Sequence, residues 1–188
     1  MRRSEYSAAP LIENPSSGER IRIRTTAAES GGALLAWDLL LAPGGRVPSG
    51  HVHPGQRERF TVVEGYLRFR IGRRRLVLGP GQSLTVPPGT PHHFANAGGT
   101  EALVMVETRP AGQMQELLEV AAALAKGEPG RPRRIPHLVD LFLFMHEFRA
   151  EVRAPYLPGR IVRPVVRAIA AAAALVGADA RYRRLRAR

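Results

Sequence analysis

The sequence predicts a mainly β domain, built as a closed barrel or a sandwich, followed by a helical extension. Two observations support the β domain: apolar and polar residues alternate with a period of two through residues 19–109, and turns rich in glycine and proline separate the alternating runs. The third observation is that 111–188 carries apolar residues at helical spacing. We therefore expect an irregular arm over 1–18, a β-barrel over 19–110 and a basic helical extension over 111–188.

The expected strands are defined by side chains that share a face. In Glu19–Thr25, Ile21 and Ile23 alternate with arginines, and the segments 66–71 and 100–108 follow the same rule. One polar and one apolar face on each strand indicate a single closed core. Turn signals lie between the strands at 43–45, 54–55, 79–81, 87–89 and 98–99.

Three helices are expected, over 112–126, 136–152 and 159–176. The second is predicted to bury a stripe of Leu138, Leu141, Phe142, Met145 and Val152. The third is predicted to bury a stripe of Ile161, Val165, Ile169, Ala172 and Val176. These stripes need cover, and one small barrel offers little outer surface, so we expect a homodimer in which at least one helix packs on the partner chain.

Composition limits the class of protein. With 188 residues, 44% of them apolar, the chain can form one well-cored domain with an appendage. The absence of cysteine excludes disulfides, zinc fingers and thiolate nucleophiles. The first fifteen residues have no apolar signal-peptide core, and no run approaches the ~20 apolar residues of a spanning helix, so we expect a cytoplasmic protein.

The charge is uneven along the chain. The formal net charge is +12, and residues 131–188 alone contain 13 arginines against 4 acidic residues. Such a tail can attract anionic lipid, so a weak contact with anionic membranes through its last arginines is one expectation. We expect no specific nucleic-acid binding, because the tail has no DNA-reading motif and Tyr182 is the only aromatic residue in its basic run.

Histidines and one glutamate form the clearest chemical pattern. His51 and His53 stand two residues apart, so both point to one face of a strand, and Glu58 follows beyond a Pro-Gly bend. His92 and His93 follow a second turn, and only one of them can face the same side; His93 is expected at the exterior or rim. Three imidazoles and one carboxylate suit a single divalent ion of Fe, Mn, Ni, Co, Cu or Zn, and the set leaves coordination positions open.

These residues carry a family resemblance. Gly45, His51, His53, Glu58 and Gly65 match the first cupin motif, G(X)5HXH(X)4E(X)6G, and Gly81, Pro87, Gly89, His92 and Asn96 match the second, G(X)5PXG(X)2H(X)3N. The chain thus resembles the small single-domain cupins of bacteria. The resemblance implies a double-stranded β-helix, or jelly-roll barrel, and implies that His51, His53, Glu58 and His92 are the metal ligands. Asn96 is expected to be structural.

The residues around the ligands predict an apolar pocket. Those expected to line it, by parity with the ligands or by their place on neighbouring strands, are Trp37, Leu39, Phe60, Val62, Phe94 and Met105. Ordinary core packing is the alternative for each of them. No second catalytic group is evident inside the barrel. His137, Asp140, His146 and Glu147 do not gather on one helical face, so no second metal site is expected.

The expected function is that of a metal-dependent oxygenase acting on a small, possibly aromatic molecule, with Glu58 able to accept a proton. An isomerase or decarboxylase, in which the ion stabilises an enolate, is an alternative from the same site. A non-catalytic binding or sensing barrel is an alternative of another class. The sequence selects neither the substrate nor the metal.

Overall fold

The computed structural model describes residues 11–47, 50–127, 138–155 and 159–187. Nine strands form two antiparallel sheets. The larger sheet has the order β1-β2-β3-β9-β4-β7 and the smaller has the order β6-β5-β8. The strands are β1 (Ile12–Asn14), β2 (Glu19–Thr25), β3 (Leu35–Leu41), β4 (Arg57–Glu64), β5 (Leu67–Ile71), β6 (Arg74–Leu78), β7 (Ser83–Val86), β8 (His92–Asn96) and β9 (Ala102–Arg109).

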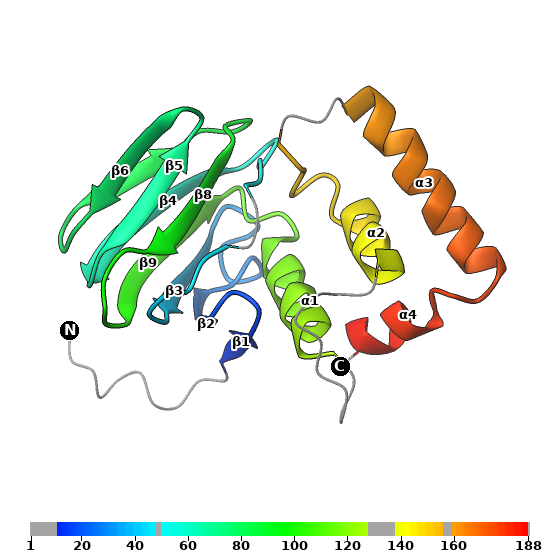
Figure 1. Ribbon diagram of the computed structural model, residues 1–188, viewed down its shortest axis with the longest axis horizontal. Coiled ribbons are helices and arrows are strands. Elements are labelled where there is room, and N and C mark those ends of the chain that lie inside the picture. Colours follow the sequence, from blue (N-terminus) through cyan, green and yellow to red (C-terminus); the bar gives the residue numbers. More distant parts are fainter. Residues whose placement is uncertain (1–10, 48–49, 128–137, 156–158, 188) are drawn as a thin grey trace.

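The two sheets face each other and enclose one apolar core, which confirms the predicted jelly-roll barrel (Figure 1). Phe60 of β4, Phe69 of β5 and Phe94 of β8 meet across the interior, with ring centroids 5.0 to 5.7 Å apart. Burying one such ring contributes roughly 1.5–3 kcal/mol to stability. The predicted alternation holds in these strands, because their intervening arginines point outward.

The first strand lies inside the segment that the sequence predicted to be an irregular arm. Ile12 pairs with Ile21 and Asn14 with Glu19, so β1 extends the larger sheet by one short strand. Its three residues are too few to show a period of two, and the pairing with β2 is what makes them a strand.

In the described residues after the barrel there are four helices: α1 (Met114–Lys126), α2 (Leu138–Glu147), α3 (Gly159–Leu175) and α4 (Ala180–Arg186). Figure 1 shows them on one side of the barrel, with α1 between the barrel and the other three. Met114, Leu117, Val120 and Leu124 of α1 are buried in the same apolar cluster as the barrel residues. Helix α1 therefore closes that side of the barrel.

The helix α4 was not predicted, and it joins the other helices through polar contacts. Tyr182 donates a hydrogen bond to Glu147 of α2, and Arg186 forms ion pairs with Glu147 and with Glu116 of α1. Burial and the neighbouring Glu147 raise the pKa of the Tyr182 phenol, so the group stays a donor. Arg186 of the basic tail is thus paired with carboxylates of the same chain.

Within this single chain the apolar stripes predicted for the second and third helices are buried only in part. Phe142 and Met145 are half-buried and Val152 packs against the core, and the side chain of Ile161 lies outside the described residues. In α3 the buried residues are Val166, Ala170 and Ala173, whereas Val165 and Val176 are exposed. In an alanine-rich helix several stripes are equally regular, and small side chains let α3 approach α2 closely. In α2 Leu138 and Leu141 are exposed, and the buried Asp140 forms an ion pair with Arg181.

No helix of the described part combines the length and the apolar character needed to cross a bilayer.

Candidate metal centre

The two histidines of the first motif lie on a short extended segment that pairs on both sides. His51 exchanges two backbone hydrogen bonds of 3.0 Å with His92 at the start of β8. Val52 pairs in the same way with Arg153, which follows α2. Because successive side chains of an extended segment alternate, His51 and His53 both point into the barrel.

The other two side chains come from the beginnings of strands. Glu58 is the second residue of β4 and His92 is the first of β8. Gln56, just before β4, donates hydrogen bonds to the carbonyl oxygens of Pro110 and Ala111, which lead into α1. This buried amide fixes the bend that turns Glu58 back toward the histidines.

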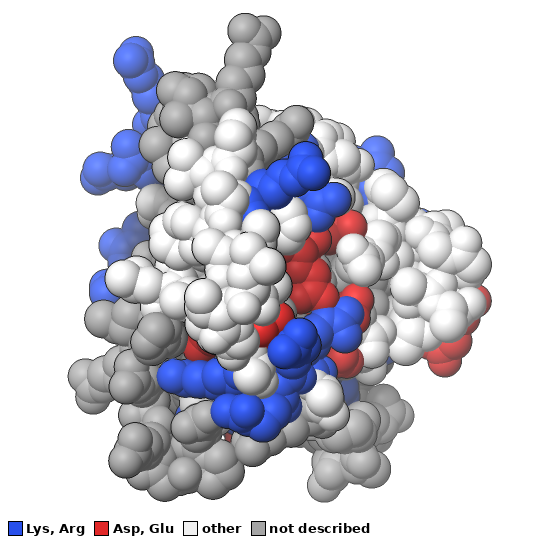
Figure 2. All heavy atoms as spheres, turned by 90° about the vertical axis from the view of Figure 1, so that its right-hand side faces the viewer, with Lys and Arg blue, Asp and Glu red and all other residues white. Residues whose placement is uncertain are grey.

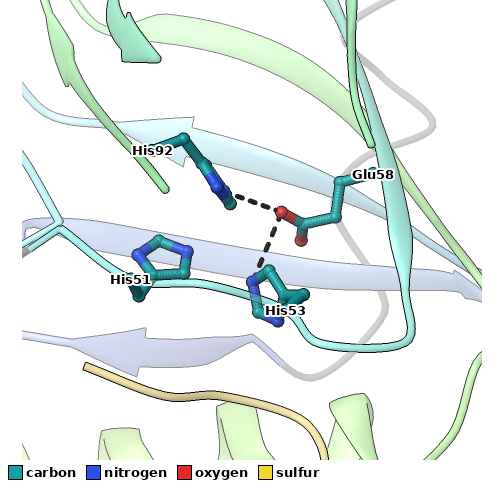
Figure 3. Close-up of side chains that lie close together, drawn as sticks. All are labelled: His51, His53, Glu58 and His92. Carbon is teal, nitrogen blue, oxygen red and sulfur yellow. Dashed lines mark hydrogen bonds and ion pairs between the residues drawn. The ribbon is translucent and has the colours of Figure 1, made fainter. Parts of the chain in front are cut away.

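The four predicted ligands converge at one point (Figure 3). Their nitrogen and oxygen ligand atoms all lie within 4.8 Å of one another. Oε2 of Glu58 is 3.0 Å from Nε2 of His92 and 3.3 Å from Nε2 of His53. The His51 ring lies 4.3 Å from the His92 ring and 4.8 Å from the His53 ring, measured between centroids. These side chains could together hold one metal ion.

Backbone carbonyl groups select the tautomer of two imidazoles. Nδ1 of His53 lies 2.7 Å from the carbonyl oxygen of Glu151, and Nδ1 of His92 lies 3.0 Å from that of Thr90. A carbonyl oxygen can only accept, so each Nδ1 carries a proton and donates it. A neutral ring then keeps its Nε2 lone pair for an ion on the side of Glu58, which is the arrangement that a metal-binding histidine needs. Without an ion, Nε2 of His92 is within hydrogen-bond distance of Oε2 of Glu58.

The histidines also control the charge of Glu58. Burial alone raises the pKa of this carboxyl, but His53, His92 and His51 more than offset that effect and hold the pKa at about 2. For His92, burial alone lowers the imidazole pKa. The hydrogen bond to Glu58 and the negative charge of Glu58 together outweigh burial, so the pKa of His92 is raised above its ordinary value. Glu58 is therefore a carboxylate at neutral pH.

Burial and donor chemistry fit a divalent transition ion. His53, Glu58 and His92 are each at most 5% exposed, so water competes little for their ligand atoms. Buried charged groups of this kind are normally paired with one another or with a metal. Three nitrogen donors and one oxygen donor are the set that Fe, Mn, Co, Ni, Cu and Zn accept.

Comparison with known families identifies the barrel. The sequence model of the cupin domain matches residues 37–108, which include both histidine motifs and run from β3 to β9. Residues 37–108 of this chain are a cupin domain. The match covers the predicted ligands and agrees with the expectation from the two sequence motifs.

Individual similarities to other cupins are distant. A germin-like protein of subfamily T, member 3, from Arabidopsis thaliana is 29% identical over 104 residues, which make up 53% of this chain and 44% of that protein. The chain thus spans less than half the length of this relative. Among solved structures, KdgF from Halomonas sp. is similar with a TM-score of 0.49 and 18% identity, over 58% of this chain and 90% of that one. The oxalate decarboxylase of Lactobacillus farciminis is similar with a TM-score of 0.48 and 17% identity, over 56% of this chain and 32% of that one.

The cupin barrel contains a cavity of about 250 Å³, and three of the four candidate ligands, His51, His53 and Glu58, lie on its wall. Of the residues predicted to line a pocket, Trp37, Leu39, Phe60 and Phe94 do lie on its wall. Helix α1 contributes Met114, Leu117, Leu118 and Ala121 to the wall, α2 contributes Phe144, and the segment after α2 contributes Val152. The remaining wall residues are Asn14, Glu19, Ile21, Val47 and Val106. Sequence periodicity could not place these helical residues, because it does not show which element closes the barrel.

Two predicted pocket residues lie elsewhere. Met105 is 37% exposed and points outward from β9, so its assignment to the pocket is wrong. Its neighbours Val104 and Val106 take the inward positions of the strand. Val62 is buried in the core but is not among the residues that line the cavity.

Two other polar residues of the motifs lie where the sequence predicted. His93 is partly exposed on the outside of β8, while His92 beside it is 2% exposed and points inward. Asn96 is buried and structural, since its amide donates to the carbonyl oxygens of Leu41 and Thr100 and its Oδ1 accepts from Gly98. No second cluster of potential metal ligands occurs in the described ranges.

The sequence analysis missed Glu19, a second carboxyl group on the cavity wall. Glu19 has the same strand parity as Ile21 and Ile23, and both of these residues pack in or against the core. This parity could have indicated from the sequence alone that Glu19 faces the interior, because the inward positions of β2 are otherwise apolar. Burial raises the pKa of the Glu19 carboxyl.

Proposed function

We propose that this cupin is a metal-dependent enzyme of the oxygenase type that acts on a small, largely apolar molecule. One observation carries the proposal: three imidazoles and a carboxylate converge at one point, and two of the imidazoles and the carboxylate line a cavity whose other walls are mainly apolar. A buried pocket with a few convergent polar groups is the usual form of a small-molecule site.

His51, His53, Glu58 and His92 would hold the ion. When bound, it would supply the Lewis-acid and redox chemistry that oxygenases need. Four protein ligands are fewer than an octahedral ion accepts, which supports access for a substrate oxygen atom. The surrounding apolar residues orient the substrate and exclude bulk water.

Glu58 is the residue of this chain best placed to move a proton. It is ionised at neutral pH, and its Oε2 faces the same space as the Nε2 atoms of His53 and His92. Its Oε1 accepts a weak hydrogen bond of 3.4 Å from the hydroxyl of Thr108, which orients the carboxylate. Glu58 can therefore accept a proton from a bound substrate at a fixed position.

The proposal is tested with two adjacent histidines. Elemental analysis of the purified full chain should find one ion per chain in the wild type and in His93→Ala, and much less in His92→Ala. With ferrous iron and a panel of small aromatic acids and diols, an oxygen electrode should record substrate-dependent uptake that His92→Ala abolishes. Full metal occupancy in His92→Ala would overturn the metal assignment. Substrate conversion without oxygen uptake would replace the oxygenase by an isomerase or decarboxylase.

A further inference from the structure

The cavity has a second polar end, away from the four candidate metal ligands. Glu19 and Asn14 both line it, and they are direct neighbours in the pairing of β1 with β2. Neither residue belongs to the two cupin motifs, and neither has a role in the function proposed above. The carboxyl group of Glu19 and the side-chain amide of Asn14 lie beside apolar wall residues such as Ile21 and Leu39.

Glu19 is held in place but keeps one oxygen atom for a ligand. The hydroxyl of Ser17, which is 2% exposed, donates a hydrogen bond of 2.5 Å to Oε2. Among the described residues, Oε1 has no hydrogen-bond partner and Glu19 forms no ion pair. Glu19 is partly buried, and its Oε1 is not one of the fully buried polar atoms of the described residues, so this oxygen is accessible to a ligand in the cavity that Glu19 lines.

Helix α1 shows how far apart the two polar ends lie. Its beginning is next to the candidate metal centre, because Ala111 accepts the hydrogen bond of Gln56 close to Glu58. Its end is next to β1, because Lys126 lies 4.0 Å from Glu13. Met114 and Ala121 of this helix both line the cavity, and seven helical residues span about 10 Å. The cavity is therefore elongated, with the histidines near one end and Glu19 near the other.

The wall between the two ends is apolar and partly aromatic. Trp37, Leu39 and Phe94 come from the barrel, and Leu117, Leu118 and Phe144 come from the helices. A molecule that fills about 250 Å³ of such a space needs an apolar body. Polar groups on it are tolerated only where the protein offers a partner, which is at the two ends.

We propose that the cavity binds an elongated, mainly apolar molecule by both ends, with an oxygen donor at the His51–His53–Glu58–His92 centre and a hydroxyl group at Glu19. This inference rests on the proposed function, since it uses the same metal centre. A hydroxyl group suits Glu19 because it can donate to a carboxylate and accept from a carboxylic acid. It also enters an apolar cavity at a lower desolvation cost than an ammonium group.

The test compares two acids that differ by one hydroxyl group. Calorimetric titration of the Ni²⁺-loaded full chain with 4-hydroxycinnamate and with cinnamate measures the dissociation constants of both. The wild type should bind the hydroxylated acid about tenfold more tightly, as expected for one buried hydrogen bond to a carboxyl group. Glu19→Leu should abolish this preference and leave cinnamate affinity and nickel content unchanged.

Glu13→Leu is the matched control, since Glu13 lies on the same strand pair but does not line this cavity. It should keep the preference of the wild type. Glu19→Gln should retain part of the preference, because an amide still offers a donor and an acceptor. The inference is overturned if Glu19→Leu keeps the wild-type ratio, or if neither acid binds to nickel-loaded protein. Failure of the metal centre itself would be seen separately, as absence of nickel.

Discussion

At the scale of single residues, backbone carbonyl groups decide how the histidines can act. Thr90 holds His92 from within the same turn, whereas the partner of His53 is Glu151, which lies 98 residues away in the sequence. The two contacts have the same chemical effect, because each fixes the proton on Nδ1 and leaves Nε2 toward Glu58. One imidazole is thus oriented locally, and the other depends on the helical extension.

Glu19 gives a prediction about stability and pH. Its pKa in the folded protein is raised by burial above the ordinary value of 4.5, so folding favours the protonated form. The stability that this group contributes is fully present below pH 4.5 and is lost as pH rises through the raised pKa. We expect Glu19→Gln, which stays neutral, to have a higher free energy of unfolding than the wild type at pH 7 and the same value at pH 4.

Urea denaturation of both proteins at the two pH values provides the measurement. The exposed Glu13→Gln serves as the control and should behave as the wild type at both. If the free energies of unfolding of Glu19→Gln and the wild type differ by the same amount at pH 4 and pH 7, then Glu19 has the same pKa in the folded and the unfolded chain, which contradicts the prediction.

At the scale of elements, the turn after α2 connects the extension to the metal centre. Phe148 is completely buried, and its carbonyl oxygen accepts hydrogen bonds from the backbone of Glu151 and Val152. The Glu151 side chain packs against Gly112, where a Cβ atom would come within 2.7 Å of its carboxylate oxygen. A side chain at position 112 would have to displace this carboxylate, and the φ of +51° also favours glycine there. The turn is therefore held from two sides at the point where Glu151 contacts His53.

Phe148→Leu should consequently weaken metal binding as well as the fold. The smaller side chain loosens the turn that positions the Glu151 carbonyl group, and loss of such outer contacts typically costs 10- to 100-fold in metal affinity. Competition with a chromophoric chelator measures this affinity for the full-length variant. Leu185→Ala, a buried substitution in α4, is the control and should lose stability without losing affinity. Wild-type affinity in Phe148→Leu would contradict a positioning role for the turn.

At the scale of the whole molecule, the helical extension presents a mixed surface. Arg181 pairs with Asp140, Arg183 with Asp179, and Arg186 with Glu116 and Glu147. Figure 2 shows blue and red groups side by side on this face, next to a broad uncharged area. Leu175 and Val176, at the end of α3, are 88% and 78% exposed. These features favour an apolar contact with protein over an electrostatic contact with anionic lipid.

We therefore predict a homodimer formed through the end of α3. Light scattering of the full chain should give twice the mass of one chain, and Leu175→Asp combined with Val176→Asp should give a monomer. Val77→Asp, at a residue 53% exposed on β6, is the control and should leave the dimer intact. A wild-type monomer that binds anionic vesicles and is released by salt would instead support the membrane interpretation.

The sequence by itself determined the candidate ligands and most of the barrel. Strand parity placed Ile21, Phe60 and Phe94 inside, because side chains of a strand alternate every two residues. The same alternation allowed only one of His92 and His93 to face inward, and the resemblance to the second cupin motif selected His92. Met105 was placed in the pocket by its position on the last strand alone, and the structure shows that it points outward between the buried Val104 and Val106.

Only the tertiary structure decided what surrounds those ligands. The contact of His53 with Glu151, the closure of the cavity by α1 and the position of Glu19 at its far end all join segments distant in sequence. The buried face of α3 was decided in the same way, since Val166, Ala170 and Ala173 form a stripe as regular as the predicted one. Periodicity shows that a segment has an apolar face, but the partner that covers the face is chosen by long-range packing.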